Sequence, residues 1–279
     1  GGSINLKTRT LSGAGALAAN GGTTGGGNHV GGGGGRIALR YLDLSTYDAS
    51  RVTSRGGDGW YGDGADGTIY LEAEGQTTGE LLINGAAPGS PFTDLILPPG
   101  QTFSSITLQD GARVIAQGAI YISETLHLRG GSMLTHPLAS EEGLAITARR
   151  IIVEAGSAID VTGRGYRGGD NAGLGETAHT LGFTPGSGRG SGGSHGGTGG
   201  DYDASDNGVP GAVYGDPKRP AALGGGGGAW AGAGGDGGGR IRIVARDALL
   251  VDGAVRADGG LSSGSASGEG AGGSIWIET

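Results

Sequence analysis

The sequence contains no cysteine, and only three tryptophans and three phenylalanines. Without cysteine the chain cannot form disulfides or thiolate metal sites. The absence of cysteine is compatible with a secreted protein but does not indicate one. No stretch of about twelve residues keeps apolar spacings of three and four without an interrupting glycine, so α-helices are not expected. There is also no apolar run near the length of about eighteen residues that a membrane helix needs, so we expect no membrane insertion.

Positive charge is scarce as well. The chain has 19 Lys and Arg residues against 27 Asp and Glu residues, and a formal net charge of −8. The basic residues are scattered along the sequence, whereas binding to nucleic-acid phosphates needs clusters of them. The composition therefore predicts no nucleic-acid partner.

Glycine is in excess, with 69 residues among 279. No strict Gly-X-Y period is present, so the chain is not collagen-like, and the usual interpretation of such a bias is disorder. Against disorder stand runs of strand length with alternating aliphatic residues, such as "RIALRYLDL", "AIYISETLHL" and "GRIRIVA". The balance favours a folded all-β protein that forms one domain over residues 1–279.

A Gly-Gly-x-Ile motif recurs along the chain. It begins at Gly1, Gly34, Gly238 and Gly272, and a variant, "DGTIYLE", begins at Asp66. The spacings within the two groups are 33, 32 and 34 residues. A second short unit follows each motif, as in "SRVTSRGG" and "GAVRADGG", and the middle of the chain repeats more tightly. The starts of those tighter repeats are Ile106, Leu126 and Ile151.

Periods of this length with β character at fixed points predict a right-handed parallel β-solenoid of about eight coils. Equivalent strands of successive coils should stack about 4.8 Å apart, so that their aliphatic side chains form ladders inside. We expect these ladder residues to be buried: Ile37, Leu39, Ile69, Leu71, Ile241 and Ile243.

The long glycine runs at 31–35 and 224–228 leave two alternatives open. They can pass as ordered extended chains beside neighbouring backbone, or they can be flexible surface loops. The segment from about 164 to 237 has almost no strand signal and is predicted to be an insertion on one face. Solenoids commonly place their function on such insertions.

Several of these stretches, among them "GGSHGGTGG", "YGDPKRPAALGGGGG" and "GGGRIRIVARDALLVDGAVRADGG", resemble glycine-rich β-helical repeat regions of very large secreted or surface proteins of bacteria and some eukaryotes. The resemblance covers about two thirds of the chain and is weakest at residues 74–150. It implies an extracellular location and a structural or adhesive role. It carries over no catalytic residues.

Two loops are rich in hard oxygen ligands between flexible glycines, which is the chemistry of a Ca²⁺ site. The candidate ligands are Asp58, Asp63 and Asp66 in the first loop, and Asp201, Asp203 and Asp206 in the second. Neither loop has the EF-hand spacing, and aspartates that form turns are the alternative. The five histidines do not converge on a metal and are expected at the surface or in turns.

Exposed aromatic rings stack on sugars or on protein partners. Trp60, Tyr61 and Trp230 are the candidates, with surface glycans as an expected partner, and packing against the solenoid wall is the alternative for the first two. The charged pairs Glu141–Glu142 and Arg149–Arg150 form no spaced catalytic motif. We therefore expect that the protein is not an enzyme.

The sequence thus predicts a structural unit of an extracellular fibre, sheath or adhesin stalk. Because its first and last motifs are equivalent, we expect units to stack head to tail as a filament or a tandem array. The expected interface residues are Ile4, Leu6, Ile275, Trp276 and Ile277. The alternative function is a polysaccharide-binding or polysaccharide-cleaving β-helix.

Overall fold

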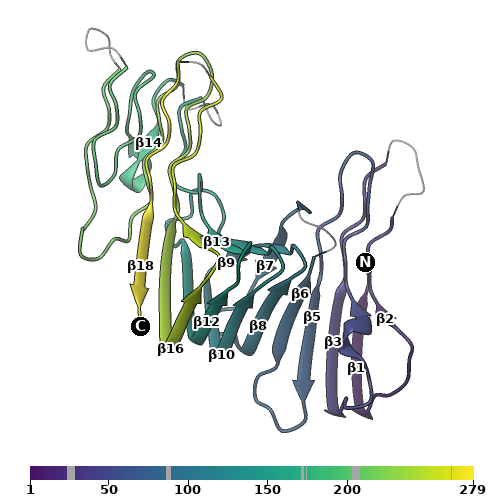
Figure 1. Cartoon of the computed structure of the whole chain (residues 1–279). Coiled ribbons are helices and arrows are strands. Elements are labelled where there is room, and N and C mark those ends of the chain that lie inside the picture. The colour runs from purple at the N-terminus through teal and green to yellow at the C-terminus, as the bar shows by residue number, and fades with distance from the viewer. Residues whose placement is uncertain (24–28, 86–88, 171–172, 174, 203–207, 265) are drawn as a thin grey trace.

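The computed structural model describes the whole chain except residues 24–28, 86–88, 171–172, 174, 203–207 and 265. The described residues form β-strands and extended segments, with two single 3₁₀ turns at Ala49–Arg51 and Leu181–Phe183. In this described part, none of the helical segments has the length and apolarity needed to cross a membrane. Glycine-rich segments rise at both ends of a long sheet (Figure 1).

Nine strands form that sheet. Their order is β1 (Ser3–Thr10), β3 (Arg36–Asp43), β5 (Thr68–Ala73), β6 (Glu80–Asn84), β8 (Thr102–Gln109), β10 (Ala119–Leu128), β12 (Leu144–Val153), β16 (Arg240–Val251) and β18 (Ser274–Glu278). All neighbouring pairs are parallel except β5 and β6. The chain is therefore an all-β protein built mainly from parallel sheet.

A second, wholly parallel sheet has five strands. They are β7 (Thr93–Ile96), β9 (Arg113–Gln117), β11 (Met133–Thr135), β13 (Ala158–Asp160) and β17 (Ala254–Arg256). Two further pairs are short: β2 (Leu17–Ala18) lies parallel to β4 (Val52–Thr53), and β14 (His179–Thr180) lies antiparallel to β15 (Thr184–Pro185). Apart from β5 and the last strand, β18, each strand of the long sheet is followed in the chain by a short strand of another sheet.

The strand register confirms the repeat read from the sequence. Ile37 pairs with Ile4 on one side and with Ile69 on the other. In the middle of the chain, Leu126 likewise lies between the first residues of the two flanking repeats. Leu17 also pairs with Val52, as the second short units of the repeat require.

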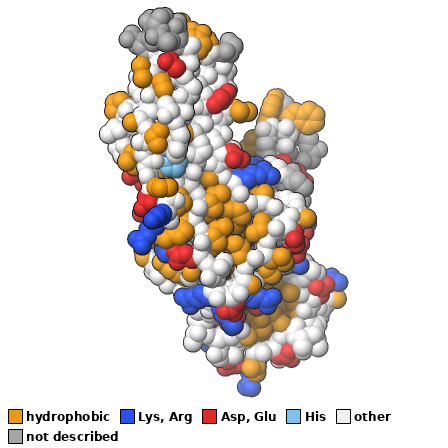
Figure 2. All heavy atoms as spheres, turned by 60° about the vertical axis from the view of Figure 1, so that its left-hand side comes forward, with side chains coloured by type: hydrophobic (Ala, Val, Ile, Leu, Met, Phe, Trp, Pro, Cys, Tyr) orange, Lys and Arg blue, Asp and Glu red, His pale blue; other side chains and the backbone are white. Residues whose placement is uncertain are grey.

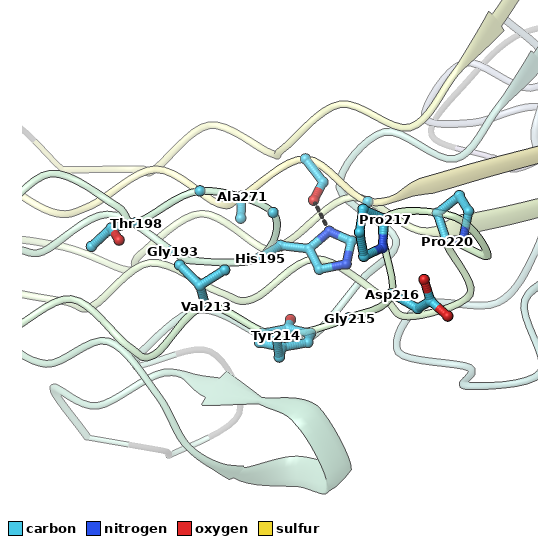
Figure 3. Close-up of a pocket in the computed structure, with 14 residues that line it drawn as sticks. Gly193, His195, Thr198, Val213, Tyr214, Gly215, Asp216, Pro217, Pro220 and Ala271 are labelled. Carbon is cyan, nitrogen blue, oxygen red and sulfur yellow. Dashed lines mark hydrogen bonds between the residues drawn. The ribbon is translucent and has the colours of Figure 1, made fainter.

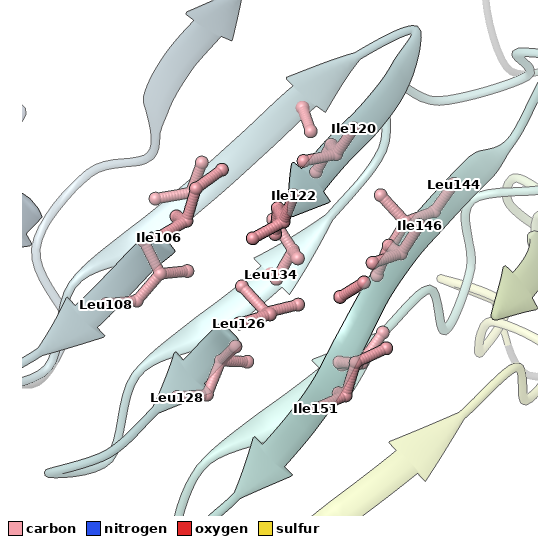
Figure 4. Packing of buried hydrophobic residues seen from close by; sticks show 14 of the residues in the cluster. Ile106, Leu108, Ile120, Ile122, Leu126, Leu128, Leu134, Leu144, Ile146 and Ile151 are labelled. Carbon is pink, nitrogen blue, oxygen red and sulfur yellow. The ribbon is translucent and has the colours of Figure 1, made fainter. Parts of the chain in front are cut away.

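The expected ladder residues are buried, with one exception. Ile37, Leu39, Ile69, Ile241 and Ile243 are at most 2% exposed, whereas Leu71 is half-buried. The apolar side chains form two separate clusters. The larger one fills the space between the nine-stranded and five-stranded sheets, and Figure 4 shows its isoleucines and leucines in rows along adjacent strands. The smaller one lies between β1, β3 and β5 on one side and Ala19, Tyr47 and Val52 on the other.

The two clusters lie on opposite faces of the nine-stranded sheet. Ile69 and Leu82 are cross-strand partners of the β5–β6 hairpin and belong to the smaller cluster. Their neighbours Tyr70 and Leu81 also pair with each other, and they belong to the larger cluster. Because successive side chains point to opposite faces, the core changes face where the strand direction reverses. The predicted parallel arrangement is broken at this hairpin, whose loop of residues 74–79 is too short for a parallel crossover.

The glycine run at 31–35 is an ordered extended chain. The amides of Gly31 and Gly34 donate to carbonyls of residues 62 and 65, at 2.8 Å each. Those of Gly32 and Gly35 donate to residues 22 and 19, on a different neighbouring segment. A partner segment that returns every third residue is typical of the polyproline II helix, which has three residues per turn.

The run at 224–228 has the same three-residue repeat and is buried. The amides of Gly224 and Gly227 donate to residues 238 and 235, and those of Gly226 and Ala229 donate to residues 179 and 176. A Cβ on Gly227 would lie 2.1 Å from the carbonyl oxygen of Gly268, so only glycine fits there. Of the two alternatives for the glycine runs, the ordered one is confirmed. Part of the predicted insertion therefore lies at the centre of a packed bundle.

Candidate functional site

The two edge strands of the nine-stranded sheet carry ladder residues that are left partly uncovered. In β18, Ile275 and Ile277 are 36% and 42% exposed, whereas their register partners Ile241 and Ile243 are buried. In β1, Ile4 and Leu6 are half-buried beside fully buried partners on β3. The difference arises because an edge strand has a neighbour on one side only.

Figure 2 brings forward the side of the molecule on which β18 lies in Figure 1. Hydrophobic side chains gather at the middle of this face, between charged groups. Ile275 and Ile277 belong to the large hydrophobic side chains that are exposed, together with Leu250 and Val251 of the neighbouring strand β16. An exposed apolar area with a polar surround is typical of an interaction surface.

On the other face of the same edge, Trp276 is half-buried under a basic residue. The Arg242 guanidinium lies 4.9 Å from the centre of its ring and forms a salt bridge of 3.3 Å with Glu278. At the opposite edge, Lys7 of β1 pairs in register with Arg40 of β3. Among the described residues, no carboxylate lies within salt-bridge distance of Lys7. Each edge strand thus carries an exposed charge on the side that points away from its own core, and the two charges are opposite in sign.

The double glycines that precede the strands contact one another in a fixed pattern. A Cβ on Gly35, the second glycine of its pair, would lie 1.9 Å from the carbonyl oxygen of Gly2 in the preceding unit. A Cβ on Gly238, the first glycine of its pair, would lie 2.5 Å from the amide nitrogen of Gly273 in the following unit. The equivalent positions at the edges are open. A Cβ on Gly2 would have no atom within 4 Å, and the nearest atom to a Cβ on Gly272 would be 3.7 Å away.

A depression of about 700 Å³ lies beside the start of β18 (Figure 3). Gly272 and Gly273 form part of its lining, together with His195 and Tyr214. The ring of His195 packs against that of Tyr214, with their centres 5.0 Å apart and their planes tilted by 42°, and its Nδ1–H donates to the carbonyl of Gly272 at 2.9 Å. Burial raises the pKa of Tyr214 to about 12, and its hydroxyl donates to the carbonyl of Leu223 at 2.7 Å. Both rings are thus fixed by backbone partners.

The aspartates of the first predicted calcium loop have structural partners. Asp63 accepts a hydrogen bond from the amide of Gly59, and Asp66, which is 3% exposed, accepts one from the amide of Gly56, both at 3.0 Å. Of the second loop, Asp201 is exposed, whereas Asp203 and Asp206 lie outside the described residues. In the described part of the chain, no group of three or more acidic or histidine side chains is arranged to hold a metal. Calcium binding stays a prediction, as does any contribution of Asp58 to it.

The predicted aromatic residues are all exposed. Trp60 and Tyr61 are 77% and 67% exposed, so packing against the wall of the fold does not occupy them. Trp230 is 40% exposed and lies under the guanidinium of Arg189. The binding of these rings to glycans stays a prediction.

Two further features noted in the sequence have defined partners in the structure. Arg149 joins neighbouring strands through salt bridges to Glu124 at 3.1 Å and to Asp247 at 2.7 Å, which is a cross-strand ladder on the sheet surface. The expectation of surface or turn histidines was wrong for His136, which is 0% exposed, and for His195, which is 8% exposed. In both residues a ring nitrogen bonds to a backbone carbonyl. This hydrogen bond compensates the cost of burying a polar ring.

The functional proposal depends on the structural features described above, because comparisons with known proteins give no match. No protein-family model, no curated protein and no solved structure matches the sequence.

Sequence reasoning found the edge strands because their motifs repeat. It missed the depression beside β18, because Gly193, Tyr214 and Gly272 line it together and yet lie on three segments that show no shared pattern. The only signal in the sequence was the cluster "VYGDPKRP", an aromatic residue beside turn-forming Gly, Asp and Pro.

Proposed function

We propose that the chain is a unit of an extracellular fibre, sheath or adhesin stalk. In this proposal its parallel strands form a right-handed solenoid, and units stack through β18 of one and β1 of the next. The observation that carries the proposal is the ladder itself. Its aliphatic rows are buried on inner strands and become half-exposed at Ile4, Leu6, Ile275 and Ile277, where a further strand would cover them.

Strand direction supports this contact in spite of the β5–β6 reversal. The core changes face at the same hairpin, so strand direction and core face reverse together. When β18 and β1 are each viewed along their own strand direction, their cores lie on the same side. A strand β1 from a second unit can therefore add to the free edge of β18 in the same way as β3 adds to β1. A second unit, rotated about the stacking axis, can add β1 parallel to β18 and continue the same core.

The repeat also sets the register of the contact. Because "GGSINLK" and "GGSIWIE" are equivalent, Ser3 would lie opposite Ser274 and Ile4 opposite Ile275. Leu6 would then cover Ile277, and each isoleucine or leucine would gain the second neighbour that inner strands have. Stacked ladders of this kind give a stiff rod, which suits a stalk or a fibre.

The double glycines provide close contact between the units. In the proposed register, the open Cβ position of Gly272 points at Gly2 of the next unit, and that of Gly2 points back at Gly273. The depression beside β18, which Gly272 and Gly273 line, is where this incoming glycine pair would lie. A side chain at either position would occupy space that the neighbouring backbone needs.

The test is to substitute these glycines. Gly2→Ala and Gly272→Ala should leave the folded chain intact, because neither position has a close atom or a positive φ. Sedimentation velocity and electron microscopy of the 279-residue chain should show head-to-tail oligomers for the wild type and their loss in both variants. Gly62→Ala is the matched control, since its Cβ position is equally open and its carbonyl is bonded to the amide of Gly31, on an inner segment. A wild type that stays monomeric at high concentration, or oligomers that persist in both variants, would overturn the proposal.

A further inference from the structure

A small cavity lies on the outer face of the five-stranded sheet. Val114, Leu134 and Ile159 of that sheet point into the core, so the residues beside them in β9, β11 and β13 point outward. The cavity has a volume of about 190 Å³. Its lining is formed by Phe92, Arg113, Met133, Thr135, Asp160, Thr162 and Arg164.

Two guanidinium groups of this lining lie against one aromatic ring. The Cζ atoms of Arg113 and Arg164 are 3.9 Å and 5.2 Å from the centre of the Phe92 ring. Arg113 also donates to the carbonyl of Ser90 at 3.3 Å. Among the described residues, neither guanidinium has a carboxylate within salt-bridge distance. Burial, followed by the like charge of Arg113, lowers the pKa of Arg164.

The one carboxylate in the lining is directed to other partners. Asp160 accepts a hydrogen bond from the amide of Thr162 at 2.9 Å, and its second oxygen lies 3.5 Å from the guanidinium of Arg256. The side chain of Asp160 is 11% exposed, so little of its charge is presented to solvent. The lining thus holds two guanidinium groups and one carboxylate whose charge is shared with Arg256, which makes the cavity a positive site in a chain of net charge −8.

An unsatisfied hydroxyl lies in the same lining. Thr135 is 1% exposed, and its Oγ1 has no hydrogen-bond partner among the described residues. A buried hydroxyl without a partner destabilises the fold, because it has lost its hydrogen bonds to water and gained none in return. A ligand that accepts a hydrogen bond from it would relieve that cost.

We propose that this cavity binds an oxyanion, a sulfate or carboxylate group, through Arg113, Arg164 and Thr135. Guanidinium donors match the oxygens of such groups in geometry, and the Phe92 ring holds both of them in place. The volume is below the roughly 300 Å³ at which pockets for drug-sized ligands begin, so the site suits a single anionic group. Its source is either a free anion or an acidic sugar.

The test is calorimetric titration of the 279-residue chain with sodium sulfate, glucuronate and a sulfated monosaccharide, at constant ionic strength set by chloride. Neutral glucose is the negative control. We expect saturable 1:1 binding that weakens about tenfold in Arg113→Gln and in Arg164→Gln. Arg51→Gln, which changes an exposed arginine elsewhere, should bind as the wild type does. Binding of sulfate without binding of either sugar identifies a free anion as the ligand.

Thr135→Val separates ligand binding from folding. It keeps the shape of the side chain and removes the unsatisfied hydroxyl, so the free energy of unfolding without ligand should rise or stay equal. The same variant should bind the anion more weakly than the wild type. Failure of all three oxyanions to saturate the wild type, or equal binding by the wild type and Arg164→Gln, would show that the cavity holds no anion.

Discussion

His136 shows how a single polar residue is fixed inside the fold. Its Nε2 accepts a hydrogen bond from the amide of Arg240 at 3.2 Å, so its Nδ1 carries the proton that bonds to the Pro137 carbonyl at 2.7 Å. Both bonds need the neutral ring, since a protonated Nε2 could not accept. Burial, together with the positive charges of Arg164 and Arg240, lowers the pKa of His136 from 6.5 to about 4.

This pKa predicts a loss of stability in mild acid. Above pH 6.5 the ring is neutral in the folded and unfolded chains, and its contribution is constant. Between pH 6.5 and 4 only the unfolded chain gains a proton there, so the free energy of unfolding should fall, by about 3 kcal/mol at most. Urea unfolding at a series of pH values across this window measures it. His136→Gln should flatten the dependence, and an equal slope in the variant would assign the effect to other groups.

At the scale of the elements, the β5–β6 hairpin divides the molecule into two parts with separate cores. The smaller core has six buried residues, Ala19, Ile37, Leu39, Tyr47, Val52 and Ile69. The larger core continues through β6 and every later strand of the nine-stranded sheet up to β16. Buried apolar area is the main source of folding stability. The part of the chain that contains the smaller core therefore has less stability of its own than the part that contains the larger core.

Hydrogen exchange should therefore resolve two opening reactions. β3 and β12 each have parallel neighbours on both sides, so their amides are equally bonded in the sheet. Native-state exchange in low urea should give a lower opening free energy for β3 than for β12, because β3 depends on the smaller core. β8 is the control and should behave as β12 does, since it contacts the larger core. Equal opening free energies for β3 and β12 would mean that the chain unfolds as one cooperative unit.

The elements that the sequence predicted are those whose residues repeat at equal intervals. Ile37 and Ile241 could be assigned to buried ladders because a repeat places the same residue type in every strand. The hairpin reversal was missed, since residues 74–79 look like any turn until the pairing of Tyr70 with Leu81 is known. The sequence left two alternatives for the glycine run around Gly227, and it did not indicate the cavity beside Phe92. Both the glycine run and the cavity depend on contacts between distant segments, which local pattern does not encode.

At the scale of the whole molecule, the nine-stranded sheet begins at β1 and ends at β18, and glycine-rich segments, among them the runs at 31–35 and 224–228, rise beside its two ends (Figure 1). In these segments glycine occupies the positions where neighbouring backbones are in contact, and a Cβ atom there would clash with the neighbouring chain. The edges differ from these segments. The Cβ positions of Gly2 and Gly272 are free of close atoms, whereas those of the equivalent Gly35 and Gly238 are blocked by neighbouring backbone. The packing at both edges is thus compatible with growth of the structure by a further unit.

The charges at the two edges give the last prediction. In the register that places Ser3 opposite Ser274, Lys7 of one unit lies opposite Glu278 of the next. Lys7→Glu or Glu278→Lys alone would set like charges against each other. A cross-strand pair contributes about 0.2–1 kcal/mol, so each change should raise the concentration needed for assembly about fivefold. High salt should reduce the difference, because these charges are exposed.

Mixing the two single variants provides the decisive comparison. In an alternating assembly, the carboxylate introduced by Lys7→Glu meets the ammonium group introduced by Glu278→Lys, and the native Lys7 meets the native Glu278 at the next contact. Every contact is then attractive again, so light scattering of an equimolar mixture should return toward the wild-type concentration dependence, while each variant alone stays impaired. Because neither chain is altered by mixing, a fold defect cannot produce this recovery. A mixture that assembles no better than its components would refute the register, and with it the pairing of β1 on β18.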